Sequence, residues 1–383
     1  MLRLSGLILL SFVSGSSIIF AQSGRRIEPT PSPAPTVIGP TYSESQPRIG
    51  RIRRPTPQAA AEVPNPQKPT PAPVTVAAID DGETLKIDTN LITIPVSVFD
   101  RNGLYVPGLK QTEFKIFEDG VEQEIAYFGT SDKPFTVALV IDVSPSTAYK
   151  IEEIRKAATA FVDQLGPEDT LVVIEFDHSV NVLSKPTKDR AQIYKAINKA
   201  DFGDGTSLYN AVDEALRKQL GLIVGRKAMV IFTDGVDTTS RKNSYDSTLN
   251  YAEESDTLIF PIYFNTYLDN TRRLSTADIY MTRGTSADEY VLGKKYLDDL
   301  SEATGGRLFK PESTPGGLTR AFEGIAEELR RQYNIGYVPS AEGKLGQRKQ
   351  IRIRVARPNL VLRARDSYVV GSAVAPQLVE KSK

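Results

Sequence analysis

The apolar positions of the chain follow two periods between residues 135 and 333. Unbroken apolar runs are typical of strands buried on both faces of a sheet. Between these runs, apolar residues recur every three or four positions, as they do on one face of a helix. This alternation predicts an α/β fold with a doubly wound, mostly parallel six-stranded sheet. The predicted strands are Phe135–Ile141, Leu171–Phe176, Val180–Leu183, Ala228–Thr233, Leu258–Phe264 and Arg307–Phe309.

Four stretches between the strands have the helical period. Their apolar faces begin at Ile151, Leu208, Tyr296 and Leu318. The third helix should end at Gly305, since glycine is the preferred residue just beyond a helix C-terminus. Residues 266–293 fit neither period, and we interpret them as a long polar insertion.

The segments on both sides of this pattern alternate apolar and polar residues, as half-buried strands do. Ile92–Val98 and Ile351–Val355 show the alternation most clearly. The two flanks are therefore predicted to pair as one small β-domain into which the α/β unit is inserted. The expected divisions are an N-terminal β segment at 85–130, the α/β unit at 134–333, a C-terminal β segment at 334–370 and a tail at 371–383.

Residues 1–21 have the pattern of a signal peptide. Arg3 supplies the positive start, Leu4–Phe20 is apolar, and Ala21 is a suitable cleavage residue. We expect an exported protein (periplasmic, cell-surface or secreted), with no transmembrane span once the signal is removed. An uncleaved membrane anchor is the alternative.

Residues 22–80 are rich in proline and poor in large apolar side chains, which predicts a disordered linker. The linker is also basic near its start. It is interpreted as a soluble spacer, with electrostatic contact to the cell envelope as the alternative. The basic residues are Arg25, Arg26, Arg48, Arg51, Arg53 and Arg54.

Composition restricts the chemistry. Cysteine is absent and His178 is the single histidine, which excludes disulfides, thiol catalysis and zinc sites built on cysteine or on two histidines. A bound metal must therefore use oxygen ligands, which favours Mg²⁺, Mn²⁺ or Ca²⁺. The 47 basic and 47 acidic residues cancel, so charge gives no argument for a nucleic-acid partner.

Oxygen-bearing side chains follow two of the predicted buried strands. Asp142, Ser144 and Ser146 come directly after the first strand, and Asp234 follows the strand at 228–233. In a doubly wound sheet, ligands bind beyond the carboxyl ends of strands where the winding direction reverses. If the two strands are neighbours there, two carboxylates face one another, and a divalent cation removes their repulsion. Thr206, at a predicted helix start, can add a hydroxyl ligand.

The order Asp142-x-Ser144-x-Ser146, Gly205-Thr206 and Thr233-Asp234-Gly235 resembles the metal-ion-dependent adhesion site of von Willebrand factor type A domains. The resemblance implies a bound divalent metal, most simply Mg²⁺, and a protein partner that donates an Asp or Glu carboxylate to it. It also implies that the five ligands are Asp142, Ser144, Ser146, Thr206 and Asp234.

The flanks extend this resemblance. The strings FDRNG, FKIFEDGVEQEI, YLDDLSEATGGRLF and LRARDSY, which begin at Phe99, Phe114, Tyr296 and Leu362, resemble a von Willebrand factor A-related family of secreted acidobacterial proteins. Two residues depart from the motif, since Pro145 and Asp204 stand where glycine is common. We interpret Asp204 as a helix cap or a solvated residue.

We therefore expect a non-enzymatic, exported module that binds proteins through a divalent metal, in the manner of an adhesion domain. An enzyme is the first alternative. Acyl-phosphate chemistry would need an acid where Ser144 stands, a serine hydrolase would need His178 as its base, and no phosphate-binding loop motif occurs.

The second alternative is a structural envelope protein whose metal only stabilises the fold. In that case the strand flanks would bind the partner, through a basic face on the C-terminal strands. An ordinary solvated strand face explains the same residues, which are Arg352, Arg354, Arg363 and Arg365.

Overall fold

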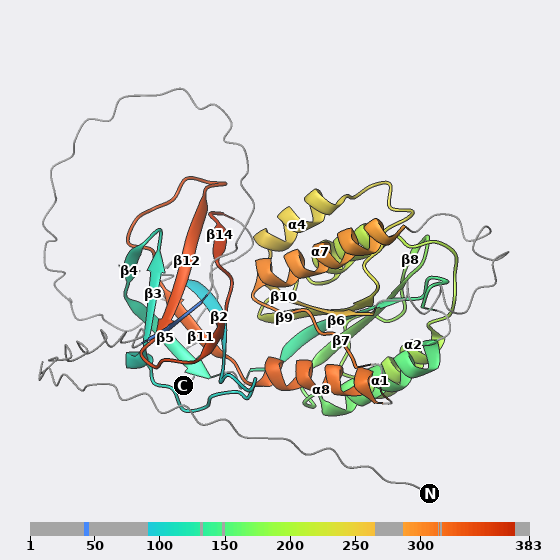
Figure 1. Cartoon of the computed structure of the whole chain (residues 1–383), viewed down its shortest axis with the longest axis horizontal. Helices are drawn as coiled ribbons and strands as arrows, with labels where there is room; N and C mark the ends of the chain where they lie inside the picture. The colour runs from blue at the N-terminus through green and yellow to red at the C-terminus, as the bar shows by residue number, and fades with distance from the viewer. Residues whose placement is uncertain are drawn as a thin grey trace, which may run out of the picture. The chain divides into compact units, whose positions relative to one another are not determined.

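The computed structural model describes residues 42–45, 91–130, 133–147, 150–264, 286–312, 314 and 316–371 (Figure 1). The predicted signal peptide, most of the proline-rich linker, nearly all of the tail and residues 265–285 of the predicted insertion lie outside the described residues. Among those described, no helix is long and apolar enough to cross a membrane.

A five-stranded sheet forms the centre of the α/β unit, with the strand order β10-β9-β6-β7-β8 (Figure 1). All neighbours in it are parallel except β7 and β8, which form an antiparallel hairpin. The doubly wound fold and the central pairing of the first and fourth predicted strands are thus confirmed. The strands are β6 (Phe135–Asp142), β7 (Thr170–Phe176), β8 (Val180–Val182), β9 (Arg226–Thr233) and β10 (Thr257–Tyr263).

The sixth predicted strand is much reduced. Instead of a full ladder at Arg307–Phe309, a single parallel bridge joins Phe309 to Ile262 of β10. Two backbone hydrogen bonds support the bridge, from Tyr263 N–H to Phe309 O at 2.8 Å and from Phe309 N–H to Pro261 O at 2.8 Å.

Helices cover both faces of this sheet. Because successive strand residues point to opposite faces, Leu139 of β6 packs under one group of helices and Val140 under the other. The first group is α1 (Ile151–Gln164), α2 (Arg190–Lys199) and α8 (Gly317–Arg330). The second is α3 (Leu208–Asp213) with the π-helical turn Glu214–Gln219, α4 (Tyr245–Glu254) and α7 (Ala287–Thr304).

Helix α7 corrects the predicted insertion. The sequence reading placed residues up to 293 in the insertion and began the helix at Tyr296, but α7 begins at Ala287. A capping box starts it, because the Ser286 side chain accepts from the Glu289 backbone N–H and Glu289 reaches back to Ser286. This Ser-x-x-Glu signal is visible in the sequence. Helices α2 and α4 were also not predicted, since both are short and bury few apolar residues.

The flanking strands form two further sheets around a core of their own. One sheet has the order β13-β2-β11-β5, and the other has β1-β12-β3-β4 with β14 also paired to β12. The first contains β2 (Ile92–Phe99), β5 (Ile125–Thr130), β11 (Tyr333–Tyr337) and β13 (Val361–Arg363). The second contains β1 (Ser43–Glu44), β3 (Phe114–Glu118), which follows a 3-10 turn at Gln111–Glu113, β4 (Val121–Gln123), β12 (Arg348–Val355) and β14 (Ser367–Val369).

Both sheets combine strands from the two ends of the described chain. Strand β12 pairs with β3, and β11 lies between β2 and β5, all antiparallel. Thr130, at the end of β5, is the direct partner of Tyr333, at the start of β11. We propose that the α/β unit is an insertion in a β-unit made from both flanks.

All four arginines of the alternative basic face have partners within the chain. Arg365 is buried and donates to the backbone carbonyls of Glu253 and Ser255. Arg363 pairs with the buried Glu328 of α8, which also pairs with Arg307 at 3.0 Å. Arg352 and Arg354 both pair with Glu44 of β1. Within the predicted linker, Ser43–Glu44 form strand β1, which pairs with β12.

Candidate functional site

Asp142 lies at the carboxyl end of β6 and is fully buried. One of its carboxylate oxygens, Oδ1, accepts the backbone N–H of Ser144 at 2.9 Å. The other, Oδ2, accepts the hydroxyl of Thr233 at 2.6 Å. Thr233 is the last residue of β9, so the parallel pairing of β6 and β9 brings Asp142 to the end of the neighbouring strand. This is where the sequence analysis placed the crevice.

Hydrogen bonds between side chains join the first loop to Asp234. The Ser146 hydroxyl donates to Asp234 Oδ2 at 2.8 Å, and the Ser144 and Ser146 hydroxyl oxygens lie 3.0 Å apart. Asp234 itself is 2% exposed, and its Oδ1 accepts the Val236 N–H at 3.1 Å. Four of the five predicted residues therefore form one connected cluster of carboxylate and hydroxyl oxygens.

Two threonines that were given no role in the sequence analysis shape this cluster. The Thr147 hydroxyl donates to the backbone oxygens of Asp142 and Ser144, at 2.8 and 3.0 Å, which folds the loop after β6 back on itself. Thr233 holds the Asp142 carboxylate and accepts the Gly235 N–H at 3.0 Å. The only sequence signal for Thr233 is its place in the Thr-Asp-Gly triplet.

The loop before α3 brings Thr206 to the same end of the sheet. Its backbone N–H donates to the Thr238 hydroxyl at 2.9 Å, and its carbonyl accepts the N–H groups of Thr238 and Thr239. The Gly203 N–H donates to Val143 O, which ties the same loop to the end of β6. Thr206 is thus fixed through its backbone, beside the loops that carry the other four residues.

Asp204, which departs from the motif, and His178, the base that a serine hydrolase would need, both lie on the outside of this loop. Asp204 is exposed, and Ser207 stands at the N-cap position of α3, so the aspartate is a solvated residue. The His178 side chain is 64% exposed and pairs with Asp177 at 3.1 Å. Its ring also contacts the carbonyl oxygen of Asp204, so the histidine belongs to the turn between β7 and β8.

Electrostatics sets Asp142 apart from ordinary aspartates. Burial, followed by the negative charge of Asp234, raises the pKa of Asp142 to about 7. The hydrogen bonds from Ser144 and Thr233 oppose this shift without cancelling it. In the described part of the chain, no cluster of three or more His, Cys, Asp or Glu side chains could hold a metal. A cation here would therefore need the serine and threonine hydroxyls as well as the two carboxylates.

Helix α7 packs directly on the loop that follows Asp234. Gly235 has a φ of +84°, and a Cβ added at Gly293 of α7 would lie 2.4 Å from the Gly235 carbonyl oxygen. This contact is possible only because neither residue has a side chain.

Gly293→Ala should therefore push α7 away from the loop and lower the free energy of unfolding by about 1–3 kcal/mol, even though alanine is the better helix former. Urea denaturation measures the change. Gly324→Ala in α8 is the matched control, because its Cβ would meet side-chain atoms and no backbone, namely the Phe309 ring at 3.0 Å and the Arg307 guanidinium at 3.7 Å. Equal effects of the two substitutions would contradict this reading of the contact.

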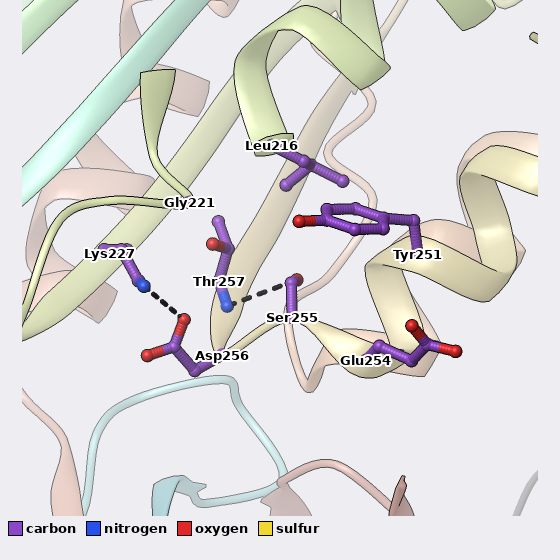
Figure 2. Close-up of a pocket in the computed structure, with 8 residues that line it drawn as sticks. All are labelled: Leu216, Gly221, Lys227, Tyr251, Glu254, Ser255, Asp256 and Thr257. Carbon is purple, nitrogen blue, oxygen red and sulfur yellow. Dashed lines mark hydrogen bonds and ion pairs between the residues drawn. The ribbon is translucent and has the colours of Figure 1, made fainter. Parts of the chain in front are cut away.

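A separate small pocket lies at the opposite end of the sheet, at the starts of β9 and β10 (Figure 2). Its volume is about 110 Å³. Lys227 donates to Asp256 at 2.5 Å and to the Ile223 carbonyl at 2.9 Å, and Thr257 N–H reaches the Ser255 hydroxyl at 3.4 Å. The pocket contains none of the five predicted site residues, so it is not the candidate site.

Comparison with known proteins agrees with this geometry. The family model described as the von Willebrand factor type A domain matches residues 137–236, which include all five predicted site residues. A UPF0353 protein of Mycobacterium tuberculosis is 34% identical over 116 residues, covering 27% of this chain and 35% of that protein. A UPF0353 protein of Mycobacterium marinum matches to the same extent. The chain thus spans about a third of the length of these relatives.

Solved structures that are similar to the chain are more distant in sequence. A von Willebrand factor type A protein from Catenulispora acidiphila has a TM-score of 0.43 and 11% identity, covering 77% of this chain and 78% of that one. The vWF domain of the type V pili tip protein Mfa5 from Porphyromonas gingivalis has a TM-score of 0.39 and 13% identity, covering 55% and 98%. On the family match at residues 137–236 and the sheet topology, the α/β unit of this chain resembles a von Willebrand factor type A domain.

Proposed function

We propose that this domain binds a protein partner through a divalent cation, with Mg²⁺ as the first choice and Mn²⁺ or Ca²⁺ as alternatives. Asp142, Ser144, Ser146, Thr206 and Asp234 would hold the ion. The observation that carries the proposal is the pair of buried carboxylates, Asp142 and Asp234, at the carboxyl ends of β6 and β9. The Ser144 backbone N–H donates to Asp142, and the Ser144 and Ser146 hydroxyls continue the link to Asp234.

The donor set fits a hard cation. Carboxylate and hydroxyl oxygens are ligands that Mg²⁺ and Ca²⁺ prefer, and two carboxylates neutralise the double charge. Burial and then the charge of Asp234 raise the pKa of Asp142, and a positive ion between the two carboxylates would remove their repulsion. Thr147 and Thr233 support the fit, because their hydrogen bonds orient the loop and the Asp142 carboxylate without adding charge.

The proposed partner contributes an Asp or Glu side chain. When bound, the cation supplies an electrophilic position at which a carboxylate oxygen of another protein can replace a water ligand. The protein residues hold the ion, orient it and leave this position open. A charge-assisted contact of this kind is directional, so a small surface can be specific for its partner.

Turnover is not part of the proposal. The Ser144 and Ser146 hydroxyls bond with each other, and Ser146 also donates to Asp234. The single histidine is held by Asp177 and the Asp204 carbonyl in a turn, so neither serine has a histidine base beside it. We infer a binding module, exported by virtue of the predicted signal at residues 1–21.

The alternative is a structural protein of the cell envelope in which the cation only stabilises the fold. It predicts that the cation raises thermal stability while partner capture is indifferent to it. The linker is a soluble spacer under either hypothesis, and electrostatic contact of its basic part with the envelope is the alternative.

Metal-dependent capture separates these hypotheses. Immobilised full mature chain should retain its partner from the exported proteins of the native cell in Mg²⁺ and release it in EDTA, with at least a tenfold loss of bound partner. Asp234→Ala should abolish capture in either buffer. Asp204→Ala is the control, because it removes an exposed acid from the same loop system without touching the ligand set.

Two results would count against the proposal. Capture that survives both EDTA and Asp234→Ala would show that the partner binds elsewhere on the chain. If Asp204→Ala reduces capture as strongly as Asp234→Ala does, the partner is attracted by the negative charge of this surface rather than by a coordinated ion.

A further inference from the structure

One edge of strand β12 is completed by a segment that is distant in sequence. Strand β14 covers the first part of this edge, where Arg348 pairs with Val369. Tyr42–Ser45, which contains β1, covers the last part and pairs antiparallel with β12. Ile351 and Ile353 direct their N–H groups to these two partners, to Asp366 O and to the Ser45 hydroxyl respectively. Alternate residues of a strand point their backbone groups the same way, so β14 and β1 share one edge.

The serines of this segment match the edge closely. Ser45 donates its N–H to Ile353 O at 2.8 Å, and its hydroxyl accepts the Ile353 N–H at 2.9 Å. The Ser43 hydroxyl accepts the N–H of Leu360, just before β13, at 2.8 Å. Both serines are 7% exposed. Larger side chains would not fit at either position without displacing the strand.

The acid between the serines meets two arginines. Glu44 pairs through one carboxylate oxygen with Arg352 at 2.8 Å and through the other with Arg354 at 2.7 Å. Arg352 and Arg354 stand two residues apart on β12 and therefore on one face, where they would repel without an acid between them. The Arg354 guanidinium also lies 4.7 Å from the ring centre of Tyr42.

We propose that this edge of β12, together with Leu360, is a binding site for a short extended peptide in which one acidic residue stands between two serines. Within the chain its occupant is Tyr42–Ser45. The peptide is recognised by strand addition, in which backbone hydrogen bonds give affinity. Arg352 and Arg354 add specificity because they form ion pairs with its acidic residue. The site is distinct from the proposed cation site, and its use does not depend on a metal.

The segment Tyr42–Ser45 should be exchangeable for a free peptide at this site. Only two residue pairs form the ladder between β1 and β12, and the ion pairs are partly exposed. Such a contact is weak between separate molecules and is favoured within one chain by effective concentration. If the segment is weakened, a free peptide of the same sequence should take its place.

The test uses the full chain and a labelled peptide of residues 40–47. The Glu44→Lys chain, whose own strand is repelled by Arg352 and Arg354, should bind the peptide at least tenfold more tightly in fluorescence anisotropy than the Glu122→Lys chain. Glu122 is the matched control because it makes an exposed ion pair with Lys115 in the same sheet. Glu44→Gln, which keeps the shape and removes the charge, should give an intermediate affinity.

Charge reversal makes the test specific. A chain with Arg352→Glu and Arg354→Glu, whose own Glu44 is now repelled, should not bind the original peptide and should bind one in which lysine replaces the glutamate. Equal binding of both peptides by all chains would overturn the proposal. Sedimentation of the unmodified chain decides the source of the strand. A monomer supports the intramolecular occupant, whereas a dimer that Glu44→Lys dissociates would overturn it in favour of a second copy.

Discussion

Replacing Asp234 by alanine should weaken Mg²⁺ binding by at least about a hundredfold, because even outer partners of metal ligands are worth about 10–100-fold and Asp234 is a proposed direct ligand. The loss is measurable by calorimetric titration and by metal-induced stabilisation. At a Mg²⁺ concentration about 100 times the dissociation constant, wild type should gain about 2.7 kcal/mol. The variant should gain only about 0.4 kcal/mol at the same concentration.

Asp234→Asn sharpens this experiment. Asparagine keeps one acceptor oxygen, so it can accept from Ser146 or from Val236 N–H, and it carries no charge next to the buried Asp142. The metal-free variant should therefore be more stable than metal-free wild type by about 1 kcal/mol, while its response to Mg²⁺ is lost. Thr206→Ala should weaken the metal less, by about tenfold, because it removes a neutral ligand.

Asp237→Asn is the matched control for these variants. Asp237 follows Asp234 by three residues and accepts the backbone N–H groups of Tyr209 and Ser240. It should affect stability and leave Mg²⁺ affinity within about twofold. If Asp237→Asn and Asp234→Asn weaken the metal equally, the ion is not held by the proposed ligands.

Glu328→Ala should lower the free energy of unfolding by about 3–5 kcal/mol. The Glu328 side chain is 1% exposed and pairs with Arg307 and Arg363. Its removal leaves two positive charges facing each other with no acid to compensate them. Burial raises the pKa of Glu328 in spite of both arginines, which shows how strongly this position is desolvated.

The neighbouring residue provides the control for this prediction. Glu327 pairs with Arg331, but both side chains are more than half exposed, so Glu327→Ala should change the free energy of unfolding by less than about 1 kcal/mol. Chemical denaturation of both variants at neutral pH gives the comparison. If Glu328→Ala lowers the free energy of unfolding by less than about 1 kcal/mol, the two arginines find other partners. The cluster would then not stabilise the fold.

Much of the candidate site could be predicted because its signals are local. Strands β6 and β9 are unbroken apolar runs, so their place at the centre of a parallel sheet follows from burial on both faces. An aspartate directly after each run then lies at the crevice by topology alone. The roles of Thr147 and Thr233 depend on loop and side-chain geometry, which cannot be predicted from the spacing of apolar residues.

The contacts that escaped prediction are those between segments far apart in sequence. Arg352 and Arg354 were interpreted as a solvated or partner-binding face because their partner, Glu44, stands in a segment whose composition indicates a linker. Four residues that complete an existing edge need no apolar pattern of their own, since the sheet supplies the partners. The burial of Glu328 could not be predicted from the sequence either, because a glutamate in a helix usually lies on the solvated face.

The direct pairing of Thr130 with Tyr333 has a consequence for protein engineering. Strands β5 and β11 are two antiparallel neighbours, and the chain between them contains the whole α/β unit. A two-residue Asn-Gly turn closes hairpins of this geometry, so it could replace everything between the two strands. Conversely, another domain could be inserted at this position if its two ends lie about as close together as two neighbouring strands. The β-unit could then serve as a scaffold for inserted domains.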